Sequence, residues 1–102
     1  MRRRWTQREV IEIAKTLGLK NFDRRSLAYW TRMGIFPEPV AKMDNVLVLY
    51  DTYEIEVGLV DISRRTREPV TITYEDVKWA KGEVLKSVKA KNMSLFLRKM
   101  KE

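Results

Sequence analysis

The sequence predicts a mainly α-helical fold that carries a small β-hairpin and ends in a C-terminal helix. Three observations support this class. A capped amphipathic segment ends at Gly18, a second amphipathic segment ends at Gly34, and two extended segments flank Asp44–Asn45, a pair suited to a tight hairpin turn. Together they predict two short helices followed by a hairpin in the first half of the chain.

The first helix is predicted by its cap. Thr6 followed by Glu9 matches a capping box, in which each side chain satisfies a backbone amide that the start of a helix leaves without a partner. The apolar residues that follow at helical spacing are Val10, Ile13, Ala14 and Leu17. Gly18 is expected to end the helix in the left-handed conformation. Leu19 and Phe22 should then anchor the following turn in the core.

A second helix is predicted over residues 23–33, with Asn21 or Asp23 as its cap. Its core-facing residues are expected to be Leu27, Trp30 and Met33. Arg24 and Arg25 occupy its first turn, where the helix dipole disfavours cations. This basic pair therefore predicts an external anion beside the start of the helix.

A hairpin over residues 40–50 is predicted after this helix. Pro37 and Pro39 cannot continue a helix and favour an extended chain. The two strands are expected at Val40–Met43 and Val46–Tyr50. Lys42 lies near the tip, where it could reach a phosphate. Because a two-stranded hairpin is marginal alone, it should pack against the helices.

Residues 54–74 allow two interpretations. Asp51 followed by Glu54 can cap a helix, and one face of that helix would carry Ile55, Leu59 and Ile62. Several β-branched residues and Gly58 favour instead a strand that returns after a loop. We prefer the helix, and a β-hairpin over 54–74 remains the alternative.

The C-terminal segment is predicted to be helical from Tyr74, with Thr73 and Asp76 as its cap. We accordingly divide the chain into a first unit, 1–69, and a C-terminal helical segment, 70–102. Apolar side chains on this helix must be buried on the same domain or on a partner subunit. The residues expected to contribute to a homodimer are Val84, Val88, Leu95 and Phe96.

The composition excludes several classes of function. The chain has no cysteine and no histidine, which removes the usual zinc ligands, thiol nucleophiles and histidine acid–base chemistry. We therefore expect no enzyme, no catalytic residue, no metal site and no cofactor.

The sequence also gives no sign of membrane insertion. Three arginines follow Met1, and no apolar run is long enough to cross a bilayer. The expected location is the cytoplasm, without membrane association.

The positive net charge of +7 is unevenly distributed. Residues 1–34 carry nine Lys/Arg against three Asp/Glu, and residues 81–102 carry seven against two. The middle of the chain, 35–80, is acidic, with five against nine. A basic N-terminal third that coincides with two short helices indicates a surface for a polyanion.

A set of residues in the first half occurs in a familiar order. They are Ala14 and Gly18, then Ser26, Leu27, Tyr29 and Trp30, then Gly34, Ile35, Phe36 and Pro37. In this order they resemble the winged helix-turn-helix of MerR-type transcription regulators, a class similar to phage excisionases and small terminase subunits. Tyr50 stands where the family closes its wing with an aromatic residue. The turn before Ser26 is longer than in the family, and Ala28 replaces a common arginine.

The resemblance implies how such a protein would act. The second helix would enter the major groove of DNA, and the wing 40–50 would lie on the backbone. Two further helices would follow, and the last one would form an antiparallel dimer. Because no ligand-binding segment follows, no small-molecule effector is expected.

We therefore expect a sequence-specific double-stranded DNA-binding protein, a small transcription regulator. The residues expected to contact DNA are Arg2, Arg3, Arg4, Arg24, Arg25, Tyr29, Arg32 and Lys42. One alternative is an architectural DNA-binding protein of the phage or plasmid type, acting in excision, packaging or partition. Another is a winged-helix module that binds a protein partner.

Overall fold

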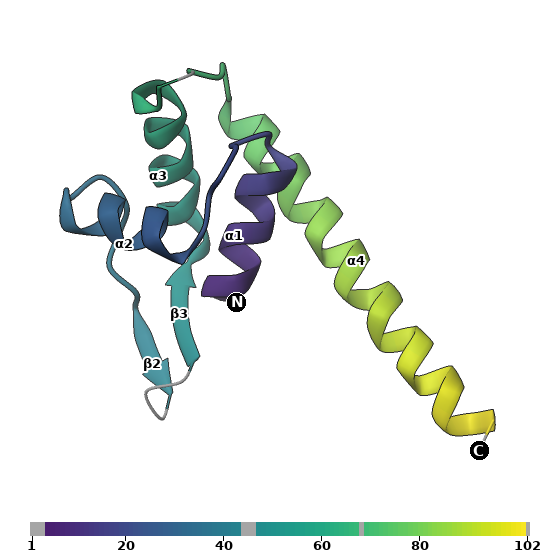
Figure 1. The fold of residues 1–102 in the computed structure, drawn as a ribbon. Coiled ribbons are helices and arrows are strands. Elements are labelled where there is room, and N and C mark those ends of the chain that lie inside the picture. Colours follow the sequence, from purple (N-terminus) through teal and green to yellow (C-terminus); the bar gives the residue numbers. More distant parts are fainter. Residues whose placement is uncertain (1–3, 44–46, 68, 102) are drawn as a thin grey trace.

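The computed structural model describes the backbone of residues 4–43, 47–67 and 69–101, and their side chains except those of 43, 47 and 88–101. Its helices are α1 (Gln7–Thr16), α2 (Arg24–Arg32), α3 (Thr52–Arg65) and α4 (Tyr74–Lys101). Its strands are β1 (Arg4–Thr6), β2 (Ala41–Met43) and β3 (Leu47–Asp51). The predicted class, mainly helical with a small sheet, is confirmed (Figure 1).

The sheet is antiparallel in the order β1-β3-β2. β2 and β3 form the predicted hairpin, with Lys42 opposite Val48. The turn predicted at Asp44–Asn45 lies outside the described residues. β1 was not predicted: Trp5 pairs with Tyr50, and this partner is too distant in sequence for a local pattern to indicate.

The predicted ends of the first two helices are confirmed. The Thr6 backbone amide donates to Glu9 Oε1 at 2.9 Å, and the Glu9 amide donates to Thr6 Oγ1 at 3.2 Å, which completes the capping box. Gly18 and Gly34 adopt φ angles of 87° and 76° after α1 and α2. Only glycine adopts this left-handed conformation without a steric cost, so both helices end where a glycine stands.

Residues 52–65 form a helix, so the alternative β-hairpin over 54–74 is wrong. The Asp51 carboxylate caps α3 by accepting from the amides of Tyr53 (3.1 Å) and Glu54 (3.2 Å). The face predicted to be apolar is fully buried, at Ile55, Leu59 and Ile62. A good cap and a continuous buried face therefore outweigh the weak preference of β-branched residues for strands.

The N-terminal half of helix α4 packs on the core. Thr73 and Asp76 cap it reciprocally, at 2.9 and 3.2 Å, as predicted. Its first turns pack against α1 and α3 through Val77, Ala80 and Val84. Gly82 does not interrupt it, and α4 continues to Lys101 past the other elements (Figure 1).

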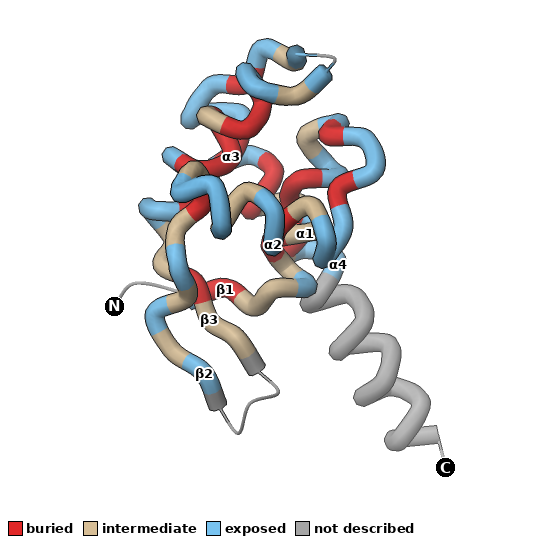
Figure 2. The backbone as a smooth tube through the Cα atoms, turned by 60° about the vertical axis from the view of Figure 1, so that its left-hand side comes forward, coloured by how far each residue is buried: buried red, intermediate tan, exposed pale blue. Residues whose placement is uncertain are grey.

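The core gathers on α1, α3 and the start of α4, whereas α2 is exposed along much of its length (Figure 2). Leu19 and Phe22 are buried as predicted, and so is Leu27. Trp30 is half-buried against the core. Met33 is 58% exposed, so its predicted core position is wrong. It follows Leu27 by six residues, which is not a whole number of helical turns.

A buried polar network joins the sheet to α3 and α4. The Lys81 ammonium donates to Glu56 Oε1 at 2.7 Å, to the Thr52 carbonyl at 2.6 Å and to Thr52 Oγ1 at 2.7 Å. Thr52 Oγ1 also accepts a hydrogen bond from Trp5 Nε1 at 3.0 Å. The three donors of the ammonium are thus all used, although Lys81 and Glu56 are only 7% and 8% exposed.

Gly58 and Gly82 offer a matched pair of Gly→Ala substitutions with opposite expected effects. A Cβ at Gly58 would lie 2.7 Å from Phe36 Cδ1 and 3.0 Å from Pro37 Cδ, whereas one at Gly82 would meet no atom within 4 Å. We expect G82A to raise the free energy of unfolding by ~0.5–1 kcal/mol, because alanine favours the helix and lowers the conformational entropy of the unfolded chain. G58A should lower it by roughly 1 kcal/mol, because overpacking against buried Phe36 exceeds that gain. Urea denaturation measures both, and a stabilised G58A would contradict the close approach of α3 to Phe36.

None of the helices in the described ranges combines the length and the apolar character that crossing a membrane requires.

Candidate nucleic-acid interface

The start of α2 is held by a local hydrogen-bond cluster. The Asp23 carboxylate accepts from the Ser26 amide at 3.0 Å and from Ser26 Oγ at 3.2 Å, and Ser26 Oγ also contacts the Asn21 carbonyl at 3.1 Å. Asn21 adopts a φ of 58°, which asparagine tolerates better than most residues. The hydrogen bond from the Ser26 amide is the main reason that the pKa of Asp23 lies below its ordinary value. This cap fixes where the first turn of α2 begins.

The exposed face of α2 is a basic stripe. Its exposed positions are Arg24, Arg25, Ala28, Tyr29 and Arg32, which share one side of the helix because residues three and four apart are neighbours. Leu27 anchors the opposite side in the core. Tyr29 is 47% exposed, and its ring packs edge to face with that of Trp30 at a centroid distance of 5.1 Å. α2 thus presents three guanidinium groups and one phenol to solvent.

These cations are not neutralised by acids of α2 itself. The first turn of α2 contains no acidic residue. Arg25 lies close enough to Asp23 to contribute to the lowered pKa of that carboxyl, as a minor cause. Among the described residues, Arg24 and Arg32 have no ion-pair partner. Arg24 therefore carries positive charge without an ion-pair partner in the first turn, where the helix dipole disfavours it, whereas Arg32 lies in the last turn, where the dipole favours cations.

The remaining predicted contact residues lie on the sheet. Lys42 is exposed on β2, and the β2–β3 hairpin lies on the same side of the fold as α2, opposite α4 (Figure 1). Arg4 is exposed on β1, which is separated from β2 by β3. The structure therefore brings α2 and Lys42 to one side and places Arg4 at the other edge of the sheet. Arg2 and Arg3 lie outside the described residues.

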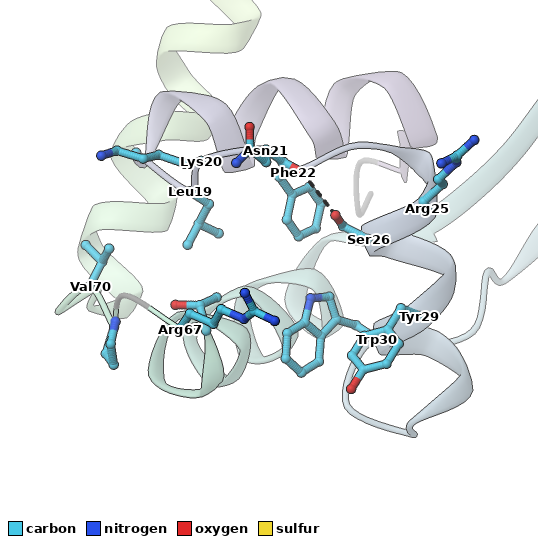
Figure 3. Close-up of a pocket in the computed structure, with 13 residues that line it drawn as sticks. Leu19, Lys20, Asn21, Phe22, Arg25, Ser26, Tyr29, Trp30, Arg67 and Val70 are labelled. Atoms are coloured by element: carbon cyan, nitrogen blue, oxygen red, sulfur yellow. Dashed lines mark hydrogen bonds between the residues drawn. The ribbon is translucent and has the colours of Figure 1, made fainter.

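A second basic segment, at the end of α3 and in the loop after it, was not predicted. Arg64, Arg65 and Arg67, at the end of α3 and in the loop after it, are exposed. Arg65 pairs with Asp61 at 3.1 Å. Arg67 and Arg25 line one groove (Figure 3). The run of arginines was visible in the sequence, but the position of Arg67 across a groove from α2 depends on the tertiary fold.

The residues expected to dimerise fall into two groups. Val84 is buried in the core of its own chain, with 6% of its surface exposed, so it is not available to a partner in this structure. The side chains of Val88, Leu95 and Phe96 lie outside those that the structure describes.

The candidate interface presents cations, hydroxyl groups and aromatic rings. Across the described ranges, no three acidic side chains converge in a way that could hold a metal ion. The chemistry available to the stripe and the hairpin is electrostatic attraction and hydrogen bonding to anionic oxygens and to base edges. Comparison with known proteins adds no family to this description, since no protein-family model, curated protein or solved structure matches the chain.

Proposed function

We propose that this chain is a sequence-specific double-stranded DNA-binding protein and that its fold is a winged helix-turn-helix. In this proposal α1 and α2 form the helix pair, and the β2–β3 hairpin is the wing. α2 enters the major groove, a docking geometry in which a short helix presents its exposed side chains to base edges. Lys42 and the wing lie along the adjacent backbone.

The observation that carries the proposal is the basic stripe of α2. Arg24, Arg25 and Arg32 share an exposed face, and a core contact at Leu27 fixes the opposite face. A structural role does not account for Arg24 and Arg25, because the dipole of α2 opposes cations at this end. An external polyanion offsets that cost. Arginine can also hold guanine through two hydrogen bonds, which would supply sequence specificity.

The biological role that we propose is that of a small transcription regulator. The motif order that resembles MerR-type regulators supports this role. An architectural protein for excision, packaging or partition would use the same stripe. A discrete footprint with two-fold symmetry supports the regulator, and cooperative coating of long DNA supports the architectural role.

A selection from random duplex DNA tests the proposal directly. We expect recovery of a defined sequence, with a binding constant that falls steeply as salt rises, because each neutralised phosphate releases condensed counterions. The mass of the complex in solution then shows whether one or two chains occupy the site. An affinity that does not change with salt, or failure to retain any duplex, would refute the proposal.

A further inference from the structure

An open groove of about 840 Å³ lies between the turn after α1, helix α2 and the loop between α3 and α4 (Figure 3). Its volume falls in the range of small-ligand sites. Arg25 and Tyr29 of the α2 stripe line it, and its other lining residues are not among those expected to contact DNA. The groove therefore extends beyond the proposed DNA-binding stripe.

The floor of the groove is apolar, and one wall is aromatic. Leu19 and Phe22 are each only 4% exposed and form the floor. Trp30 is half-buried, and its indole forms part of the wall beside the exposed ring of Tyr29. The two rings meet edge to face, with an interplanar angle of 76°. A flat, partly exposed ring surface of this kind suits a planar partner.

The polar part of the groove is cationic. Lys20, Arg25 and Arg67 line it, and no acidic residue is among the described lining residues. Figure 3 shows the Arg67 guanidinium directed toward the middle of the groove, whereas the charged ends of Lys20 and Arg25 lie at its edges. Arg67 has no hydrogen-bond or ion-pair partner in the described part of the chain. The expected ligand thus carries both a planar ring and an anionic group.

We propose that the groove binds an unstacked nucleotide, with its base against Trp30 and its phosphate held by Arg67. Any base can stack on an aromatic side chain, and a guanidinium matches a phosphate with two parallel hydrogen bonds. A free nucleotide and a base displaced from a DNA strand share this chemistry. The inference does not depend on duplex binding, since a free nucleotide needs only the groove.

The three tryptophans provide a test with internal controls. Trp5 donates its indole N–H to Thr52 in the core, and Trp79 is 58% exposed on α4. On titration of the ¹⁵N-labelled chain with deoxyadenosine monophosphate, we expect the indole signal of Trp30 to shift saturably while the other two stay in place. Deoxyadenosine and inorganic phosphate should each bind at least about tenfold more weakly, since each lacks one recognised group. A static Trp30 signal, or equal binding of either fragment, overturns the proposal.

Two glutamine variants distinguish binding in the groove from general electrostatic attraction to the positive surface. Arg67→Gln should weaken nucleotide binding about tenfold, because one charge-assisted contact is lost. Arg64→Gln removes the same charge from the end of α3, where Arg64 lines a different cavity, and should leave the affinity unchanged. Equal losses in the two variants would overturn the proposal.

Competition distinguishes the two sources of the nucleotide. A duplex with one unpaired adenine should displace the mononucleotide if the groove takes bases from DNA. If neither this duplex nor a fully paired one displaces it, the ligand is a free nucleotide. Equal displacement by both duplexes would assign the groove to ordinary duplex binding and overturn the proposal, while leaving the proposed function intact.

Discussion

Replacing Arg24 and Arg25 together with alanine is expected to weaken binding to the selected duplex about a hundredfold, or roughly 1.4 kcal/mol for each arginine. If both arginines contact phosphates, the slope of log K against log[salt] should become less steep by about 2. If one of them reads a base, the loss should be larger for the selected sequence than for random DNA. Fluorescence anisotropy at several salt concentrations measures all three quantities.

The variant should remain as stable as the parent, within about 0.5 kcal/mol, because both side chains are exposed and the dipole of α2 opposes their charge. Lys78→Ala/Lys86→Ala is the matched control. It also removes two exposed cations, but from α4, where they form exposed pairs with Glu75 and Glu83. If this control loses as much affinity as the α2 variant, the binding reflects net charge, and the proposed role of α2 is wrong.

The part of the fold that could be predicted from sequence depends on local interactions. Helix caps and terminal glycines interact with residues only a few positions away, so the local sequence pattern indicates them directly. This holds for the caps at Thr6 and Thr73 and for the glycines after α1 and α2. β1 could not be predicted in this way. Its three residues form a strand only because β3 supplies the partner, and the same residues locally resemble a helix start.

The candidate site likewise has a part that depends on local sequence and a part that depends on tertiary packing. The basic stripe could be predicted because one helix carries all its members, and helical periodicity alone places them together. The groove could not be predicted, because Arg25 and Arg67 line it together only in the folded chain, one from α2 and the other from the loop after α3. Gly58 is a third example. In the sequence it looks like an interruption, and in the fold it lets Phe36 and Pro37 approach α3 closely.

The buried pair formed by Lys81 and Glu56 carries a cost of desolvation. Burial lowers the pKa of Lys81 from its ordinary value of 10.5, and the hydrogen bond and charge of Glu56 offset this only in part. Between the lowered pKa and 10.5 the unfolded chain binds more protons than the native chain, so the contribution of Lys81 to stability rises with pH in that window. In the native protein the ammonium charge is therefore a net cost relative to the unfolded chain. Its partners reduce this cost without abolishing it.

Lys81→Met should lower the free energy of unfolding by about 3–5 kcal/mol, because it leaves the Glu56 carboxylate buried without its cation. The double variant Glu56→Leu/Lys81→Met should recover most of this loss, since apolar replacement of a buried pair is often neutral or stabilising by ~1–4 kcal/mol.

The loss in free energy of unfolding caused by Lys81→Met alone should also become smaller at acidic pH. An unpaired buried carboxyl has a raised pKa, so its penalty disappears as pH falls through that value and the group becomes neutral. Urea denaturation of both variants at neutral and acidic pH measures these effects. If the double variant is as unstable as the single one, the hydrogen bonds to Thr52, rather than the ion pair, hold α4 against α3.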